Sequence, residues 1–150
     1  MKKTGSIVYY FALLTALSLF LTGCPKKHVP DTGDNMLVGR WQLDDIRISG
    51  ISLSINDCIR RSSMEFDSDH RARASFFTVY ESTHQCTLHL RHEGEWTYEN
   101  GTFYIIVRVK NGETLDPPER KQVYILDDRH IYTHGDIDGY DALLYFHKVE

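Results

Sequence analysis

The chain has 150 residues, of which 41% are hydrophobic and 12% aromatic, and its formal net charge is −4 with histidine neutral. Its 17 basic residues are outnumbered by 21 acidic ones and are not clustered into a basic block. This argues against nucleic acid or an anionic lipid surface as a partner. Once the N-terminal segment is set apart, the remaining length suits one folded domain with its own core.

The N-terminal segment has the layout of a secretory signal. Lys2 and Lys3 supply positive charge, residues 7–21 are almost wholly apolar, and small residues then lead to Cys24. This apolar stretch is shorter than the about 20 residues that a transmembrane helix needs. We therefore expect residues 1–23 to be removed as a signal peptide.

The residues just before Cys24 identify the kind of signal. Residues 21–24 read Leu-Thr-Gly-Cys, which resembles the lipobox of bacterial lipoproteins. The resemblance implies lipidation of Cys24, and two or more acyl chains hold a protein stably on a membrane. Pro25 follows, so the acidic residue that often retains lipoproteins in the inner membrane is absent. We expect a protein of the bacterial cell envelope, anchored at the outer membrane.

Residues 24–36 are polar, contain two prolines and one glycine, and are predicted to form a flexible tether, which leaves 37–150 as the domain. Two further cysteines, Cys58 and Cys86, lie within that domain. In an oxidising compartment an isolated pair most simply forms a disulfide. Two thiols bound to a metal are the alternative, but no Cys-x-x-Cys spacing supports it.

Short runs of alternating, β-branched and aromatic residues predict eight or nine strands with hairpin-length turns. The expected strands are Leu37–Ile48, Ser63–Phe66, Arg71–Tyr80, Cys86–His92, Glu95–Tyr98, Thr102–Lys110, Gln122–Leu126, Ile131–His134 and Ala142–Val149. Asn100-Gly101 predicts a tight hairpin, because both central residues of that turn need positive φ. Ser49–Arg61 predicts an extra strand or a short helix, and Pro117-Pro118 predicts a loop. The pattern favours an all-β fold, an antiparallel up-and-down barrel whose closure removes exposed edges.

The order of several short motifs resembles that of bacterial lipocalin-like lipoproteins over residues 37–148. The motifs are Gly39-x-Trp41 in the first strand, a cysteine before the second strand, Met64-Glu65-Phe66 before an acidic turn, a cysteine ahead of Gly94-Glu95-Trp96, and Val123-Tyr124-Ile125-Leu126. The resemblance implies a barrel of about eight strands with a small apolar or amphipathic ligand at its open mouth. The first strand also resembles that of heat-shock lipoprotein-like envelope domains, but their later Gly-Cys-Asn stretch is missing.

Two glycine–tryptophan pairs, Gly39 with Trp41 and Gly94 with Trp96, are expected to be structural. The indoles are large enough to fill the closed end of a small barrel while their N–H groups bond carbonyls. An eight-stranded barrel has room inside for side chains or for one small ligand, so a packed interior and a pocket both remain open. The candidate ligand-lining residues are Phe76, Tyr80, Phe103, Ile105, Tyr132 and Phe146.

No catalytic motif is present, since the chain lacks a Gly-x-Ser-x-Gly elbow, a His-Glu-x-x-His helix and a phosphate-binding glycine loop. We expect neither an enzyme nor a cofactor. His130, His134 and Asp136 are weak candidates for a metal site, because imidazole and carboxylate suit zinc or copper. A polar outer face with acidic turns is the simpler explanation, because the tight paired spacing of a structural zinc site is absent.

The sequence therefore predicts a lipid-anchored, lipocalin-like binding protein that holds a small apolar or amphipathic ligand. The alternative is a protein–protein interaction module of the envelope, or an enzyme inhibitor, with a packed barrel and no ligand. Its expected surface is the Asn111–Arg120 loop together with the acidic Asp127–Asp141 region, because loops on a rigid scaffold carry recognition and acidic loops attract cationic partners.

Overall fold

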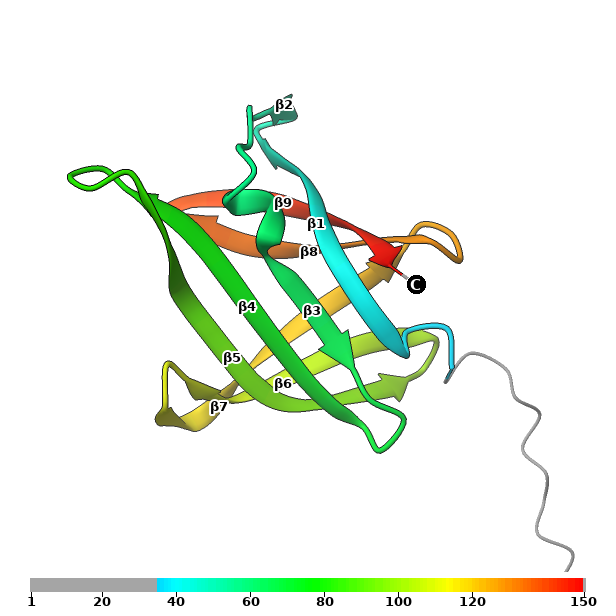
Figure 1. Ribbon diagram of the computed structural model, residues 1–150. Coiled ribbons are helices and arrows are strands. Elements are labelled where there is room, and N and C mark those ends of the chain that lie inside the picture. Colours follow the sequence, from blue (N-terminus) through cyan, green and yellow to red (C-terminus); the bar gives the residue numbers. More distant parts are fainter. Residues whose placement is uncertain (1–34, 150) are drawn as a thin grey trace, which may run out of the picture. The chain divides into compact units, whose positions relative to one another are not determined.

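The structure, a computed structural model, describes residues 35–149 (Figure 1). The predicted signal peptide, the predicted anchor Cys24 and most of the predicted tether lie outside these residues. The described residues belong to one compact unit, Thr32–Glu150, which has its own hydrophobic core. Within the described part of the chain, no helix is long and apolar enough to cross a membrane.

One antiparallel sheet closes on itself in this unit (Figure 1). Its strands are β1 (Gly39–Ile48), β2 (Ile51–Ser52), β3 (Ser63–Phe66), β4 (Arg71–Tyr80), β5 (Gln85–Glu99), β6 (Thr102–Lys110), β7 (Glu113–Ile125), β8 (His130–Ile137) and β9 (Tyr140–Val149). Strand β1 pairs with β3, each strand from β3 to β8 pairs with the next one in the chain, and β9 returns to pair with β1. The two-residue β2 pairs only with the end of β1, so eight strands form the wall. The prediction of an all-β antiparallel barrel is confirmed.

One correction concerns β5, which the sequence divided into two strands at Glu93-Gly94. Strand β5 continues through Gly94 without a break, and its pairing with β6 shifts register there because Arg108 of β6 is an extra, bulged residue. A Cβ atom at Gly94 would lie 1.9 Å from the carbonyl oxygen of Ile106. Glycine is therefore needed here for close backbone approach rather than for a turn.

A second correction concerns Pro117-Pro118, which lies within β7 and not in a loop. The pairing of β7 with β6 jumps from Glu119–Val107 to Thr114–Val109, so the prolines sit where the ladder is interrupted. A strand accommodates proline at such a bulge because no ladder hydrogen bond needs its missing N–H.

The hairpin predicted at Asn100-Gly101 is confirmed by φ values of 53° and 84°. Asp138-Gly139 forms the same kind of turn between β8 and β9, with φ values of 54° and 83°. The stretch Ser49–Arg61 contains both of its predicted alternatives, the short strand β2 and a 3₁₀ turn over Ile59–Arg61.

Large aromatic side chains fill one end of the barrel. Trp41 is fully buried and its Nε1 donates a hydrogen bond to the carbonyl oxygen of Leu37 at 2.7 Å. Trp96 is 2% exposed and its Nε1 donates to the carbonyl oxygen of Asp67 at 2.9 Å. The other aromatic residues buried in this core are Phe66, Phe103 and Phe146. Gly39, at a φ of +132°, lies against the Lys148 side chain, whose ammonium sits over the Trp41 ring.

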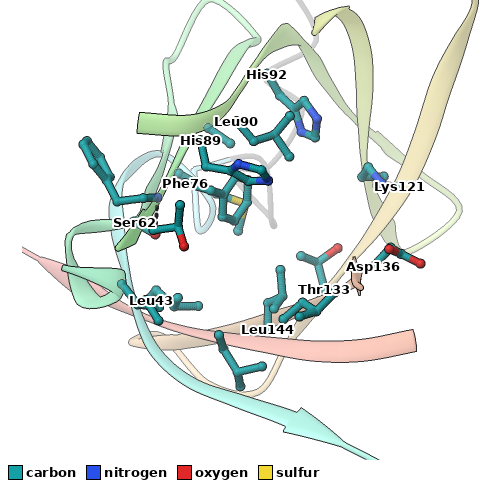
Figure 2. A pocket seen from close by; sticks show the side chains of 18 of the residues that line it. Leu43, Ser62, Phe76, His89, Leu90, His92, Lys121, Thr133, Asp136 and Leu144 are labelled. Carbon is teal, nitrogen blue, oxygen red and sulfur yellow. Dashed lines mark hydrogen bonds between the residues drawn. The ribbon is translucent and has the colours of Figure 1, made fainter. Parts of the chain in front are cut away.

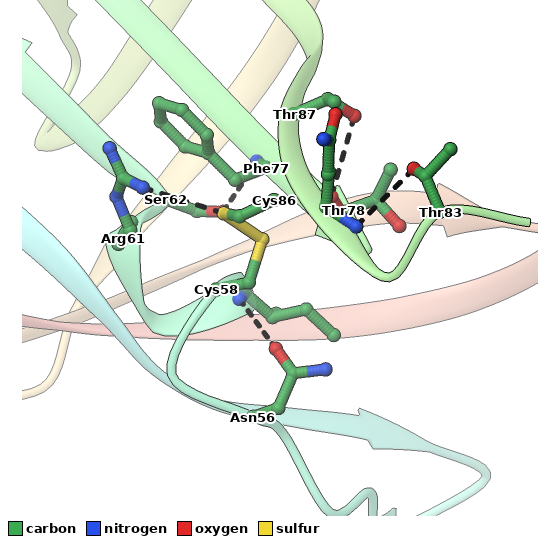
Figure 3. The surroundings of a disulfide bond; sticks show 11 residues. Asn56, Cys58, Arg61, Ser62, Phe77, Thr78, Thr83, Cys86 and Thr87 are labelled. Atoms are coloured by element: carbon green, nitrogen blue, oxygen red, sulfur yellow. Dashed lines mark hydrogen bonds between the residues drawn. A yellow bond between two sulfur atoms is a disulfide. The ribbon is translucent and has the colours of Figure 1, made fainter. Parts of the chain in front are cut away.

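The predicted disulfide between Cys58 and Cys86 is confirmed (Figure 3). It ties the 3₁₀ turn that precedes β3 to the beginning of β5. Around it, the Arg61 guanidinium contacts the Cys86 sulfur, and Ser62 Oγ accepts a hydrogen bond from the Phe77 N–H at 2.9 Å. The segment before β3 is thereby attached to the hairpin formed by β4 and β5.

Replacing Gly94 with alanine is expected to lower the free energy of unfolding by about 3 kcal/mol, because the new Cβ would overlap backbone that cannot move aside. Urea denaturation of Gly94→Ala measures this. Gly101→Ala is the matched control. A Cβ atom at Gly101 would meet no other atom within 4 Å, so its only cost is the backbone strain of an alanine at positive φ, about 1 kcal/mol. Equal stability of the two variants would contradict the close approach at Gly94.

Removing the disulfide in a Cys58→Ser/Cys86→Ser variant is expected to cost roughly 3–4 kcal/mol, from the chain entropy of the loop it closes. The two cysteines are 28 residues apart. Chemical denaturation of the purified variant, compared with the reduced and oxidised wild type, gives the value. A variant as stable as the oxidised wild type would show that the bond does not restrain the unfolded chain.

Candidate functional site

The barrel interior contains a cavity of about 720 Å³ (Figure 2). It extends to the end of the barrel opposite the tryptophans, where its wall includes the turns at Asn111 and Asp138 and the segment Leu53–Ile55. The cavity exists because small side chains, Ala72, Ala74 and Ser62, occupy inward positions at this level.

The cavity wall is largely apolar. Its main apolar side chains come from nearly every strand, namely Leu43, Ile46, Met64, Phe76, Leu90, Ile105, Val107 and Leu144. Most of them are also part of the continuous hydrophobic core. Burying a ligand's apolar surface against such a wall is favourable by about 25 cal/mol per Å² removed from water.

Three buried polar side chains interrupt this wall: Ser62, His92 and Thr133, which are 1%, 8% and 4% exposed. Ser62 Oγ accepts from the Phe77 N–H, and Thr133 Oγ1 donates to the Gln122 carbonyl at 2.7 Å. His92 Nε2, in contrast, is buried and has no hydrogen-bond partner among the described residues. Burial lowers the pKa of His92 below its ordinary value, and the charge of Lys121 lowers it further.

The structure places the six predicted lining residues in three different surroundings. Phe76 and Ile105 line the cavity. Phe103 and Phe146, 4% and 1% exposed, belong to the packed core near the tryptophans and do not line it. Tyr80 is 61% exposed at the end of β4.

Tyr132 lies on the outer face of the barrel, because its neighbours Ile131 and Thr133 on β8 are the buried ones. Its ring stacks on Tyr124 with centroids 4.5 Å apart and contacts Tyr145 at 5.4 Å. Aromatic residues thus pack on both the inner and the outer face of this wall. Hydropathy alone could not tell which of them face inward.

The sequence did not single out His92, Lys121, Ser62 or Thr133 as lining residues. A signal was available for His92, because it lies two residues after Leu90, on the face of β5 that alternation assigns to the apolar residues. For Lys121, the apolar residue Val123 two positions later gives the same indication.

The metal candidates do not converge. His130, His134 and Asp136 follow one another along β8, where His130 and His134 are about 13 Å apart along the strand and His134 and Asp136 border the cavity. His130 Nδ1 instead pairs with Asp127 at 2.9 Å, and His134 Nδ1 with Asp141 at 3.1 Å. Among the described residues, no three histidine, cysteine or acidic side chains could hold a metal ion.

The surface predicted for a protein partner is also not continuous. Asn111–Arg120 is mostly strand β7 rather than a loop. The Asp127–Asp141 region contains β8, so its two acidic turns lie at opposite ends of that strand. These segments therefore do not form one loop surface.

A closed antiparallel barrel with one end filled by aromatic residues and a cavity at the other defines a class of small β-barrel domains with a single open end. The sequence profile of the lipocalin-like domain family matches residues 37–130, which is most of the barrel, and the chain belongs to this family.

Comparison with curated proteins gives no match. Among solved structures, a redesigned β-barrel is similar at 14% sequence identity and a TM-score of 0.47, covering 78% of this chain and 95% of its own.

Because the pKa of His92 is lowered in the folded barrel, protonation favours the unfolded chain, and the contribution of His92 to stability is lost as pH falls below its ordinary pKa of 6.5. We expect a His92→Phe variant to lose less free energy of unfolding than the wild type between about pH 7.5 and pH 5.5. Denaturation at several pH values measures the slope. Arg91→Phe, at an exposed position on the same strand, leaves His92 in place and is the control, which should keep the wild-type slope.

Proposed function

We propose that this protein is a binding protein and not an enzyme, and that it holds one small apolar or amphipathic molecule in the barrel cavity. The cavity of about 720 Å³ with its apolar wall is the observation that carries the proposal. Ligand pockets in proteins commonly measure about 300–1,000 Å³ and combine apolar walls with a few polar groups. Membership of the lipocalin-like family supports the same role.

We further propose that Cys24 is acylated and anchors the protein in the bacterial cell envelope, at the outer membrane. The charged start, the apolar stretch and the Leu-Thr-Gly-Cys sequence of residues 21–24 support this. Labelling cells with a radioactive fatty acid tests it. Incorporation into the wild-type protein and its loss in Cys24→Ala are the expected results, and an unlabelled wild type would contradict the anchor.

A second candidate function, binding of a protein partner, has one specific observation in its favour. Exposed apolar side chains surround the open end of the barrel, and we call them the apolar rim: Ile51, Leu53, Tyr80, Leu88 and Tyr140. Exposed apolar clusters often mark interaction sites. The cavity supports the ligand-binding proposal over this alternative, which was based on a packed barrel without a ligand.

Filling the cavity is expected to abolish binding of small apolar molecules. Ala74, 8% exposed, lines the cavity, and an Ala74→Phe side chain would project into it. For residues 32–150, we expect the affinity for the neutral fluorescent probe N-phenyl-1-naphthylamine to fall by about tenfold or more. Arg91→Phe, on the outer face of the neighbouring strand, should bind as the wild type does.

Thermal unfolding shows whether each variant is folded, and native mass spectrometry of the wild type shows whether a molecule copurifies. A wild type that binds no probe would contradict the proposal. So would an Ala74→Phe variant that is folded and binds the probe normally.

A further inference from the structure

Only one buried polar atom of the cavity wall is left without a partner. Ser62 and Thr133 are both hydrogen bonded within the barrel, whereas Nε2 of His92 has no partner among the described residues. A buried donor or acceptor without a partner is costly, by about 1–3 kcal/mol in mutational data. Such an atom in the wall of a ligand-sized cavity indicates a place where an occupant supplies the missing hydrogen bond.

The position of His92 makes this atom part of a defined site. His92 lies on β5 between Ala74 of β4 and Lys110 of β6 in the pairing register. The edge of its ring faces Phe76, with centroids 6.1 Å apart. The small Ala74 side chain leaves the space beside the imidazole open, and the aromatic contact holds the ring in place.

Positive charge lies on the same wall. Lys121 of β7 lines the cavity, and Figure 2 shows it on the same side as His92. Lys121 Nζ and Lys110 Nζ both approach one carboxylate, that of Glu119, at 3.4 Å and 3.8 Å. Two cations share one anion here, so the Glu119 carboxylate alone does not balance the two ammonium groups.

Two acidic side chains of the cavity wall are engaged elsewhere, and a third, Asp138, lies in the turn between β8 and β9. Glu93 pairs with Arg91 at 2.9 Å, and Asp136 accepts a hydrogen bond from the Gly139 N–H across the β8–β9 turn. Glu93 and Asp136 are therefore not the partners of the two lysines. An imidazole N–H and an ammonium on one wall form two donors, which suits the two oxygens of a carboxylate.

We infer that the natural ligand is an amphipathic molecule with a carboxylate headgroup, and that His92 Nε2 and Lys121 Nζ bind this headgroup while the apolar wall holds the rest. This inference rests on the proposed ligand-binding function and names the chemical class of its ligand. The headgroup provides the acceptor that Nε2 lacks, and Lys121 exchanges part of its contact with Glu119 for the ligand.

The test compares dodecanoate with dodecanol, which share a chain and differ in the headgroup. Displacement of N-phenyl-1-naphthylamine from residues 32–150 gives both affinities. We expect the wild type to prefer the carboxylate by about tenfold or more, as charge-assisted hydrogen bonds allow. Lys121→Met and His92→Phe should each reduce this preference, because each removes one of the two donors to the carboxylate, whereas dodecanol offers a single uncharged oxygen.

Lys148→Met is the matched control, because Lys148 lies over Trp41 at the closed end and donates to the Met36 carbonyl. It should retain the wild-type preference. As a measurement that needs no variant, the side-chain ¹⁵N signal of His92 Nε2 should shift when dodecanoate is added to the wild type and shift much less with dodecanol.

The outcomes separate the two proposals. If neither compound displaces the probe and no probe binds, the ligand-binding function itself fails. If both bind equally well to the wild type, or if the preference survives in Lys121→Met and His92→Phe, the cavity binds ligands but the carboxylate site at His92 and Lys121 is overturned. An unchanged His92 signal on saturation with dodecanoate would also overturn it.

Discussion

The pairing of β9 with β1 is the constraint on which the rest of the structure depends. The ladder runs from Arg40–Val149 to Ile48–Ala142 and joins the last strand to the first. Closure removes the free edges of the sheet and sets the circumference of the barrel. Once the wall has eight strands, the interior is only as wide as a few side chains, so the sizes of the inward residues decide whether it is packed or hollow.

The inward-facing side chains are large at one end of the barrel and small at the other. Trp41, Trp96 and Phe146 fill one end, and the indole N–H groups find carbonyl partners there, so the closed end carries no polar penalty. At the other end, Ala72 and Ala74 occupy inward positions of β4 and Ser62 lies in the turn before β3, and a cavity results. The disulfide between Cys58 and Cys86 fastens that turn to β5 and thereby supports the wall of the open end.

The polar residues of the cavity follow from the same geometry. A histidine on an inward position costs stability unless its nitrogen atoms have partners. Ser62 and Thr133 meet this requirement through backbone groups, while the buried Nε2 of His92 has no partner among the described residues. A protein selected for stability alone would favour an apolar residue at this position, so the retained imidazole is consistent with a role in ligand recognition.

Local patterns in the sequence determined the strand content, the Asn100-Gly101 hairpin, the disulfide and the family resemblance, because alternation, turn chemistry and cysteine pairing act over short distances or in a known chemical setting. Tertiary structure alone decided which aromatic residues face the cavity, the core or the solvent. Register shifts at Gly94 and at Pro117-Pro118 change which residues of neighbouring strands lie opposite each other. The stagger between strands then sets how deep in the barrel each inward side chain lies. For this reason Phe76, Phe103 and Tyr132 look alike in the sequence but have different surroundings in the fold.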